Sequence, residues 1–406
     1  KSAGILVVGL LLGWLFFGGS SADQPQSMDE HLLKGRIVDR LLFKEPMTEE
    51  SIPSYKDIDF YKKQHRIALA NCGKINPESI EEYIANNGYE AAGQALTGMT
   101  PQKIIEEVKK LGQLGNHFYR LGCQTDILSY AADQKGRLNP AKMEKLYAGI
   151  READPDLRVL HLDNINPATL INQPEAGRKI IEIITKYNTP GDTAAFGLES
   201  ADPLVLEKNN IEADPNLTFK AIRLLNEIGG KRVNGVPKLL PGINFLHGLI
   251  GEREETFEYN YNFLKRVYEA DLMLRRINIR QVVQIEGYPT EKVDKGKFKE
   301  YKQKVNKKIN QPMLKRVFPA HTVLKDVRIE KIEGKISYGR QLGTYPILVA
   351  VPGKLKLNKF YDVKVIDHGY RSITALPWPI NISQLSADQL SFIPGIGKKR
   401  ASKIFL

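Results

Sequence analysis

Two cysteines are the residues of this 406-residue chain best suited to redox or metal chemistry. Cys72 and Cys123 are too few for a disulfide framework or a zinc ribbon. An iron–sulfur cluster that leaves one iron open for a substrate needs three thiolates from one short loop. The sequence has no CxxxCxxC motif. It therefore predicts no metal ligand set, with Cys72 an ordinary buried thiol and Cys123 a structural one.

Polar residues follow the apolar runs that the sequence predicts as strands. The carboxyl ends of parallel strands meet at one edge of a sheet, where ligands bind. The alternative is that these residues cap the helices that follow, and for Ser200 and Asp202 before Pro203 both interpretations stand. In chain order they are His161, Asp163, Asn164, Glu199, Ser200, Asp202, Gly248, Gly251, Glu252, Gln281, Gln284 and Glu286.

A third group lies in LSADQLSFIPGIGKKRASKIFL, where two amphipathic turns of helix flank a glycine turn. Gly395 and Gly397 permit that tight turn. The amino end of the second helix presents N–H groups to a phosphate, beside Lys398, Lys399 and Arg400. The pattern resembles a helix-hairpin-helix motif, and the expected binding to nucleic acid is sequence-independent and salt-sensitive.

The elements that would position these residues alternate between apolar runs and helical patterns, which predicts βα units and a parallel sheet. Five such repeats form most of an open (β/α) barrel, so the predicted fold class is α/β with an incomplete barrel. The predicted strands are 117–122, 157–163, 193–199, 242–250 and 275–283. The predicted helices are 140–152, 174–187, 203–209, 216–228 and 254–269.

This region resembles an archaeal group of radical S-adenosylmethionine (SAM) proteins related in architecture to methylthiotransferases. The likeness lies in NHFYRLGCQTDILSY, LHLDNINPATL, YNTPGDTAAFGLESADPLVLEKNN, LLPGINFLHGLIGEREETFEYNYNFLKR and RRINIRQV. The resemblance implies a SAM site in which Gly248, Gly251 and Glu252 of the turn HGLIGE lie against the adenine. It also implies that Glu199 and Ser200 contact the sugar or the methionyl part. A 4Fe–4S cluster is expected from the family, but its ligands are absent from this chain.

Residues 318–380 alternate short strands and turns, which predicts a small β-barrel. The runs TVLKDVRIEKI, KISYGRQLG, YPILVAVPG, FYDVKVIDHG and SITALPW resemble the TRAM-like module of RNA-modifying radical SAM enzymes. The resemblance implies basic and stacking contacts to RNA; alternatively, the barrel only packs on the core. The residues that would supply these contacts are Arg340, Tyr345, His368, Tyr370 and Arg371.

Residues 29–112 carry a different pattern, predicted to be mainly helical. Pro77 stands in the first turn of one helix, and Thr100 caps another before Pro101. The runs EHLLKG, IPSYKDIDFYKKQ, RIALANCG, INPESIEEYI and MTPQKIIEEVKK resemble the flavin-bearing subunit of NADH:quinone oxidoreductases and NAD(P)-dependent hydrogenases. The flavin loop that this family carries next is replaced by LGQLGNHFYRLG, so the resemblance implies a scaffold without its active site.

Residues 1–28 begin with the apolar run 4–17, GILVVGLLLGWLFF. Fourteen helical residues rise about 21 Å, less than the roughly 30 Å hydrocarbon core. The run is typical of a signal segment or a marginal membrane anchor, and it resembles the leader of periplasmic adaptor subunits of efflux pumps. Membrane contact is expected only if this run is retained, whereas the main body indicates a cytoplasmic protein.

The net charge of +12 and the pI near 9.3 favour an anionic partner. Much of this charge lies in the run 291–316, before the barrel, which holds nine lysines, one arginine and three acidic residues. Together with the helix hairpin of residues 381–406, it predicts nucleic acid, RNA in particular, as the partner. The alternative is a basic surface that binds nothing.

Four functions are compatible with these features. The first is a radical SAM-family protein with nucleic-acid-binding modules, catalytically impaired because the cluster loop is absent. The second is a non-catalytic protein that binds nucleic acid and SAM, and the third is a chimeric fusion with no coherent activity. A fragment of an NADH-dependent oxidoreductase subunit is the fourth, since only a linker region of that family is present.

Overall fold

The structure is a computed structural model that describes residues 42–45, 48–54, 56–65, 70–72, 74–90, 100–122, 125–283, 289–393 and 395–405. The chain divides into two compact units, residues 1–99 and residues 100–406. Each unit is described by itself. The apolar run 4–17 and Cys123 lie outside the described residues. No helix among the described ranges is long and apolar enough to cross a membrane.

The first unit holds short elements in its described part. Strands β1 (Phe43–Lys44) and β2 (Ser51–Ile52) form an antiparallel hairpin, and the helices are α3 (Asp59–Lys62) and α4 (Ile80–Ala85). The predicted start of the second helix at Pro77 is wrong. The helix starts three residues later because the Ser79 hydroxyl accepts from the Glu82 N–H at 3.1 Å and caps it there.

Cys72 is exposed, so the predicted buried thiol is wrong. It lies in a turn of the first unit, where Asn71 and Lys74 are exposed as well. The apolar side chains of α4 are exposed too, Tyr83 by 45% and Ile84 by 56%. The apolar stripe of this helix therefore has no covering layer among the described residues, and a mainly helical fold is not confirmed for this unit.

The second unit begins with α6 (Pro101–Gln113), which Thr100 caps as predicted. Val108 of this helix is buried, and Ile104, Ile105 and Leu111 pack against the main core. Gly149 lets α6 come close to the next helix, because a Cβ at this position would lie 2.2 Å from Ile105 Cδ1. Helix α6 thus belongs to the α/β body that follows it.

Five parallel strands form an open half-barrel. Strand β3 pairs with β4, and β5 pairs with β8, which pairs with β9. Backbone bonds from Ala195 to Asp163 (2.9 Å) and from Ile165 to Ala195 (3.1 Å) join the two groups, giving the order β3-β4-β5-β8-β9. The strands are β3 (Phe118–Leu121), β4 (Val159–Leu162), β5 (Asp192–Glu199), β8 (Leu239–His247) and β9 (Arg276–Gln281). Strand order therefore follows chain order, as five successive βα repeats predict.

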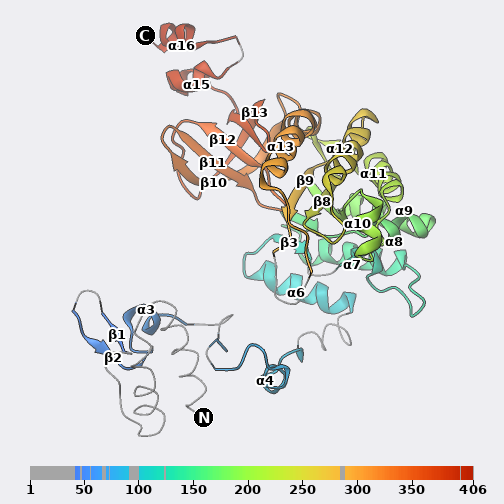
Figure 1. The fold of residues 1–406 in the computed structure, drawn as a ribbon. Helices are drawn as coiled ribbons and strands as arrows, with labels where there is room; N and C mark the ends of the chain where they lie inside the picture. The colour runs from blue at the N-terminus through green and yellow to red at the C-terminus, as the bar shows by residue number, and fades with distance from the viewer. Residues whose placement is uncertain are drawn as a thin grey trace. The chain divides into compact units, whose positions relative to one another are not determined.

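Helices between the strands cover the outer face of this sheet (Figure 1). Most begin with proline in the first turn after an Asn or Asp cap, for example Asn139 before α7 and Asp214 before α11. The helices are α7 (Pro140–Ala153), α8 (Pro167–Asn172), α9 (Pro174–Tyr187), α10 (Pro203–Lys208), α11 (Pro215–Gly229) and α12 (Glu254–Glu269). Every predicted strand and helix of this region is confirmed to within three residues at each end.

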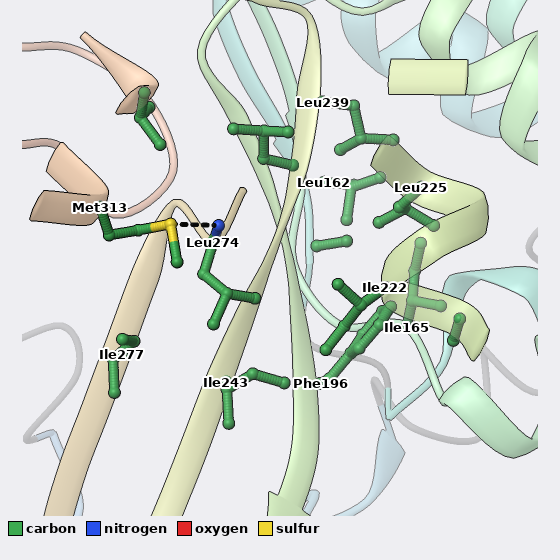
Figure 2. Packing of buried hydrophobic residues seen from close by; sticks show 14 of the residues in the cluster. Leu162, Ile165, Phe196, Ile222, Leu225, Leu239, Ile243, Leu274, Ile277 and Met313 are labelled. Atoms are coloured by element: carbon green, nitrogen blue, oxygen red, sulfur yellow. Dashed lines mark hydrogen bonds between the residues drawn. The ribbon is translucent and has the colours of Figure 1, made fainter. Parts of the chain in front are cut away.

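The main core lies between the sheet and these helices. Figure 2 shows Phe196 of β5 beside Ile222 and Leu225 of α11, all fully buried. On the other side of β8, the Leu274 N–H donates to the Met313 sulfur at 3.2 Å. Alternate residues of each strand point away from this core. The opposite, concave face is therefore left for polar side chains.

A helical connector leads to a closed β-barrel. It consists of α13 (Lys295–Val305), a π-helical turn (Asn306–Asn310) and α14 (Gln311–Val317). The barrel strands are β10 (Val323–Glu333), β11 (Ile336–Gln341), β12 (Leu348–Pro352), β13 (Phe360–His368) and β14 (Ser372–Pro377). Their order around the barrel is β10-β11-β12-β14-β13, with only β12 and β14 parallel. This five-stranded Greek-key arrangement is that of OB-type barrels.

Two short helices, α15 (Ala387–Ser391) and α16 (Lys398–Phe405), end the chain. They share a small core of Leu385, Leu390 and Ala401, with Ile393 and Ile396 against it. The Gln389 amide donates to the Pro352 carbonyl at 2.8 Å and ties this pair to the β-barrel. A hairpin (β6, Arg232–Val233; β7, Val236–Pro237) precedes β8 at the amino end of the sheet.

Candidate cofactor and nucleic-acid sites

The concave face of the half-barrel is polar where the strands alternate away from the core. On β9, Arg276, Asn278 and Arg280 alternate with the apolar Ile277 and Ile279. Asn278 donates to Asn244 of β8 at 3.2 Å, and the two stand opposite each other in the strand register. A sheet with one apolar and one hydrogen-bonding face is therefore covered by helices on one side only.

Glu199 ends β5 with a strained backbone. Its φ is +59°, in the left-handed region that side-chain-bearing residues seldom adopt, and a β-bulge separates it from Gly197. A Cβ on Gly197 would lie 2.9 Å from Glu199 Oε1, so the carboxyl folds back over the glycine. Strain of this kind is typical of functional positions.

The charge around Glu199 comes from arginines. Burial raises the pKa of the Glu199 carboxyl, and the nearby Arg280 guanidinium partly offsets that rise. Burial lowers the pKa of the Arg276 guanidinium, and the positive charges of Arg280 and Arg371 act in the same direction. Guanidinium groups thus lie near both acidic side chains of this face, with Arg280 near Glu199 and Arg120 paired with Asp163. This arrangement favours a ligand with an anionic group.

A loop of the β-barrel closes the side of the concave face next to β4. The Thr344 N–H donates to His161 Nδ1 at 2.9 Å, and the Thr344 hydroxyl donates to the Leu162 carbonyl at 2.8 Å. The next residue, Tyr345, donates to Asp163 Oδ1 at 2.9 Å. Gly343 makes this approach possible, because a Cβ there would lie 2.6 Å from the His161 ring.

His161 is neutral in this position. Burial lowers the pKa of its imidazole to about 4. Since Nδ1 accepts the Thr344 N–H, the ring carries its proton on Nε2, which has no hydrogen-bond partner among the described residues. The separation of 3.9 Å between His161 Nδ1 and Asp192 is therefore not an ion pair.

Tyr345 lies within a cationic cluster. The Arg276 guanidinium lies 3.9 Å from the centroid of its ring, and Arg120, which pairs with Asp163, lies 5.8 Å from it. Burial and the hydrogen bond to Asp163 raise the pKa of the Tyr345 phenol. The phenol therefore remains protonated and donates, which holds the loop on the sheet.

The other predicted cofactor residues make contacts within the protein. Ser200 is fully buried, and its hydroxyl accepts from the Asp202 N–H at 3.1 Å. Asp202 caps α10 and accepts from the Thr256 hydroxyl at 2.7 Å, so the capping alternative is confirmed for it. The Glu252 carboxylate is bonded to His247 Nδ1 at 2.7 Å and to the Gly248 N–H.

The two glycines of the HGLIGE turn have left-handed φ values of +93° at Gly248 and +80° at Gly251. A Cβ on Gly248 would meet Glu291 and Val293 at 3.4 Å, and one on Gly251 would meet Lys208 of α10 at 3.2 Å. The turn thus packs against other segments of the chain. Contact of these residues with a cofactor stays a prediction, as do the roles of Gln284 and Glu286, which lie outside the described residues.

An iron–sulfur cluster does not fit the residues of this chain. No group of three or more His, Cys, Asp or Glu side chains in the described ranges could hold a metal ion. The whole sequence supplies two cysteines, of which Cys72 belongs to the first unit. Three thiolates from one loop are therefore not available within it.

The carboxyl-terminal basic residues are exposed. Lys398, Lys399 and Arg400 occupy the first turn of α16, and the Arg400 guanidinium donates to the Gly395 carbonyl at 2.8 Å. Gly395 has φ +88°, and the Ala401 N–H donates to the Gly397 carbonyl at 2.9 Å. The glycines thus build the turn that the sequence predicts, with cations at the helix start.

Among the predicted barrel contacts, only Tyr370 and Arg371 are exposed in a loop, between β13 and β14. His368 is buried and bonded to the Phe318 carbonyl at 2.6 Å, and Arg340 pairs with Glu330. Tyr345 is turned into the half-barrel. These three side chains make contacts within the protein, and their contact with RNA stays a prediction.

Comparisons with known proteins give two long relatives, and no protein-family model matches the chain. An uncharacterized protein of Archaeoglobus fulgidus is 44% identical over 306 residues, which is 73% of this chain and 58% of the relative. An uncharacterized protein of Methanocaldococcus jannaschii is 44% identical over 286 residues, 67% of this chain and 52% of the relative. The chain thus spans little more than half the length of these relatives.

A short match concerns a different protein. The NADP-reducing hydrogenase subunit HndC of Solidesulfovibrio fructosivorans is 54% identical over 54 residues, which is 13% of this chain and 11% of that subunit. A likeness to part of such a subunit is therefore confirmed. It covers too little of HndC to transfer its activity.

Among solved structures, coproporphyrinogen III oxidase (HemN) of Escherichia coli, a radical SAM enzyme, has a TM-score of 0.34 and 16% identity. The match covers 56% of this chain and 46% of HemN. The radical SAM methyltransferase TsrM of Kitasatospora setae has a TM-score of 0.32 and 14% identity, covering 46% and 31%. TM-scores this low do not define a shared function.

Sequence reasoning took only strand ends as site positions and therefore missed four polar residues of the concave face, which are Asn244, Arg276, Asn278 and Arg280. The signal was present in RINIRQ, where polar and apolar residues alternate with a period of two. In a strand covered by helices on one face, this alternation marks the second face as polar. The same test applied to GINFLH would have found Asn244.

Replacing Tyr345 by Phe tests the contact between loop and sheet. We expect the free energy of unfolding to fall by about 1–3 kcal/mol, because Asp163 loses a buried charge-assisted hydrogen bond. Denaturant unfolding followed by circular dichroism measures the change. Tyr370→Phe is the matched control, since Tyr370 is 51% exposed. Equal stability of the two variants would contradict the role of this hydrogen bond.

Proposed function

We propose that the chain is a radical SAM-family protein whose half-barrel binds SAM and whose carboxyl-terminal modules bind nucleic acid, without radical chemistry of its own. The observation that carries the SAM part is Glu199, strained at the carboxyl end of β5 with its pKa raised by burial and Arg280 nearby. Perturbed titratable groups at strand ends are typical of ligand sites in parallel α/β folds.

SAM matches the chemistry of this face. Its methionyl part carries a carboxylate and an ammonium group, and its ribose carries hydroxyls. Arg280 would bind the carboxylate, and the Glu199 carboxylate would accept from the ammonium or the ribose. Asn244 and Asn278 would complete the polar wall. The resemblance of LLPGINFLHGLIGE and RRINIRQV to radical SAM proteins supports the same assignment.

Catalytic impairment follows from the cysteines. In radical SAM enzymes, the cluster supplies the electron that cleaves SAM reductively. Because three thiolates are missing from this chain, we assign it SAM binding only. A chimeric origin is the second candidate, favoured by the 54-residue likeness to a hydrogenase subunit next to a body similar to archaeal proteins.

Nucleic acid is the proposed partner of the hairpin formed by α15 and α16. The first turn of α16 combines free N–H groups with three exposed cations, which suits a phosphate. The OB-type order of the β-barrel adds support, because barrels of this kind bind single strands. We propose RNA as the substrate class, with DNA as the comparison.

Binding of SAM is measured by isothermal titration calorimetry. Glu199→Gln and Arg280→Ala should each weaken binding at least tenfold, because each removes a charged hydrogen-bonding group worth about 1.5–3 kcal/mol. Glu207→Gln, on the exposed side of α10, is the matched control and should bind like the unaltered protein. Absence of SAM binding to the unaltered protein would overturn the proposal.

Reconstitution with iron and sulfide under anaerobic conditions tests the catalytic assignment. We expect no stoichiometric 4Fe–4S absorption spectrum and no 5′-deoxyadenosine, since the chain lacks the third thiolate. Release of 5′-deoxyadenosine in proportion to bound iron would show that the chain is an active enzyme.

The hairpin is tested with a double variant. Lys398→Ala combined with Lys399→Ala should lower RNA affinity and reduce the dependence of log K on log salt by about 0.7 for each lost phosphate contact. Lys403→Ala, exposed at the other end of α16, is the control. An unchanged slope in the double variant would remove the hairpin from the binding surface.

A further inference from the structure

A groove lies between the β6–β7 hairpin and the start of the β-barrel. Its volume is about 570 Å³, and Asn234, Gly235, Pro319, His321, Lys325 and Trp378 form its main walls. Gly235 has φ +84°, and a Cβ there would lie 3.3 Å from Thr322, so the hairpin can approach the barrel this closely only with glycine. The groove therefore has walls from two parts of the second unit.

Trp378 supplies an aromatic surface in this groove. Its side chain is 40% exposed, although tryptophan is usually well covered in a folded domain. The Lys364 ammonium lies 4.2 Å from the centroid of the indole ring. An exposed indole next to an ammonium group is suited to stacking a planar base whose phosphate is close by.

The charged groups of the groove are cationic. Lys325 is exposed, no carboxylate in the described ranges lies within ion-pairing distance of it, and none of the lining residues is acidic. Arg232 is engaged otherwise, since its guanidinium donates to the carbonyls of Gly235 and Val317 at 2.7 Å each. Arg232 thus shapes the wall, whereas Lys325 is left for an anion and the Lys364 ammonium lies next to the indole of Trp378.

His321 shows that the wall is held under strain. Its φ is +75°, and its N–H donates to the Val365 carbonyl at 2.8 Å, which fixes this conformation against β13. The exposed imidazole of His321 therefore lines the groove, as Lys325 does. Its ring can donate to a phosphate in addition to the lysines.

From these observations we infer that the groove is a second nucleic-acid site, which binds a single strand by stacking a base on Trp378 with its phosphates at Lys325 and Lys364. Stacking on an aromatic side chain within a cationic groove is how single strands bind without sequence preference. A duplex does not fit this chemistry, because its bases are already stacked on each other. The inference rests on the nucleic-acid part of the proposed function and not on SAM binding.

The groove and the SAM site proposed at Glu199 lie at opposite ends of the sheet. The β6–β7 hairpin precedes the amino end of β8, whereas Glu199 ends β5. The nine residues of β8 span roughly 26 Å from end to end. Only a polymer is long enough to contact the groove and the strand ends at Glu199 at the same time. The groove therefore acts as an anchor for a strand rather than as a reaction site.

The chain offers a specific optical probe of this groove. It contains two tryptophans, Trp14 and Trp378, so Trp14→Phe leaves Trp378 as the sole emitter. Titration of this variant with a ten-nucleotide uridine RNA should quench its fluorescence saturably, and a ten-nucleotide thymidine DNA tests whether the sugar matters. A ten-base-pair duplex should give no quenching, because its bases cannot stack on the indole.

Two further variants in the Trp14→Phe background decide the assignment. Lys325→Ala should weaken the quenching titration at least fivefold, whereas Lys354→Ala, exposed on the same barrel, should leave it unchanged. The variant lacking Lys398 and Lys399 should still be quenched to the same extent at saturation. The second site would be overturned if neither the RNA nor the DNA single strand quenched the fluorescence. It would also be overturned if quenching were lost in the Lys398/Lys399 variant but kept in Lys325→Ala. SAM calorimetry remains a separate test.

Discussion

An open parallel sheet of five strands has one face that no helix of the described residues covers, and the rest of this structure depends on how that face is filled. The β-barrel provides part of the answer, because its β11–β12 loop brings Thr344 and Tyr345 onto His161 and Asp163. These contacts satisfy buried polar groups that would otherwise cost about 1–3 kcal/mol each. The loop therefore makes barrel and half-barrel one compact unit.

The part of the concave face that the loop leaves uncovered carries the functional signals. Glu199 is strained, burial raises the pKa of its carboxyl, and Arg280 lies near it, while Arg276 stands on the same face of β9 as Arg280. A ligand carboxylate would pair with these guanidinium groups, which is the role proposed for the methionyl carboxylate of SAM.

Binding of a polymer follows from features outside the half-barrel. The first turn of α16 offers cations and unpaired N–H groups, and the groove at Trp378 offers an aromatic surface with lysines. The two features rest on different physics, since one relies on a helix terminus and the other on stacking. They belong to the same unit as the concave face, so the proposed function joins a small-molecule site to surfaces for a longer partner in one unit.

The sequence by itself determined the order of βα repeats, the helix start at Thr100 and the five strands of the β-barrel. These features are local: a cap, a proline or a period of alternation acts over a few neighbouring residues. Two predictions were wrong, the burial of Cys72 and the start of α4 at Pro77. Burial depends on partners distant in the chain. The start of α4 is set by Ser79, which caps the helix in place of the turn at Pro77.

Only the tertiary structure decided which polar residues face the site. Glu252 and Ser200 are predicted ligand contacts that bond to His247 and to the Asp202 N–H in the structure, and their contact with a cofactor stays a prediction. Tyr345 was expected on the outside of the barrel and instead binds Asp163, far from it in the chain. The reason is that sequence shows the polarity of a side chain but not its partner, which for Tyr345 comes from a segment 182 residues away in the chain.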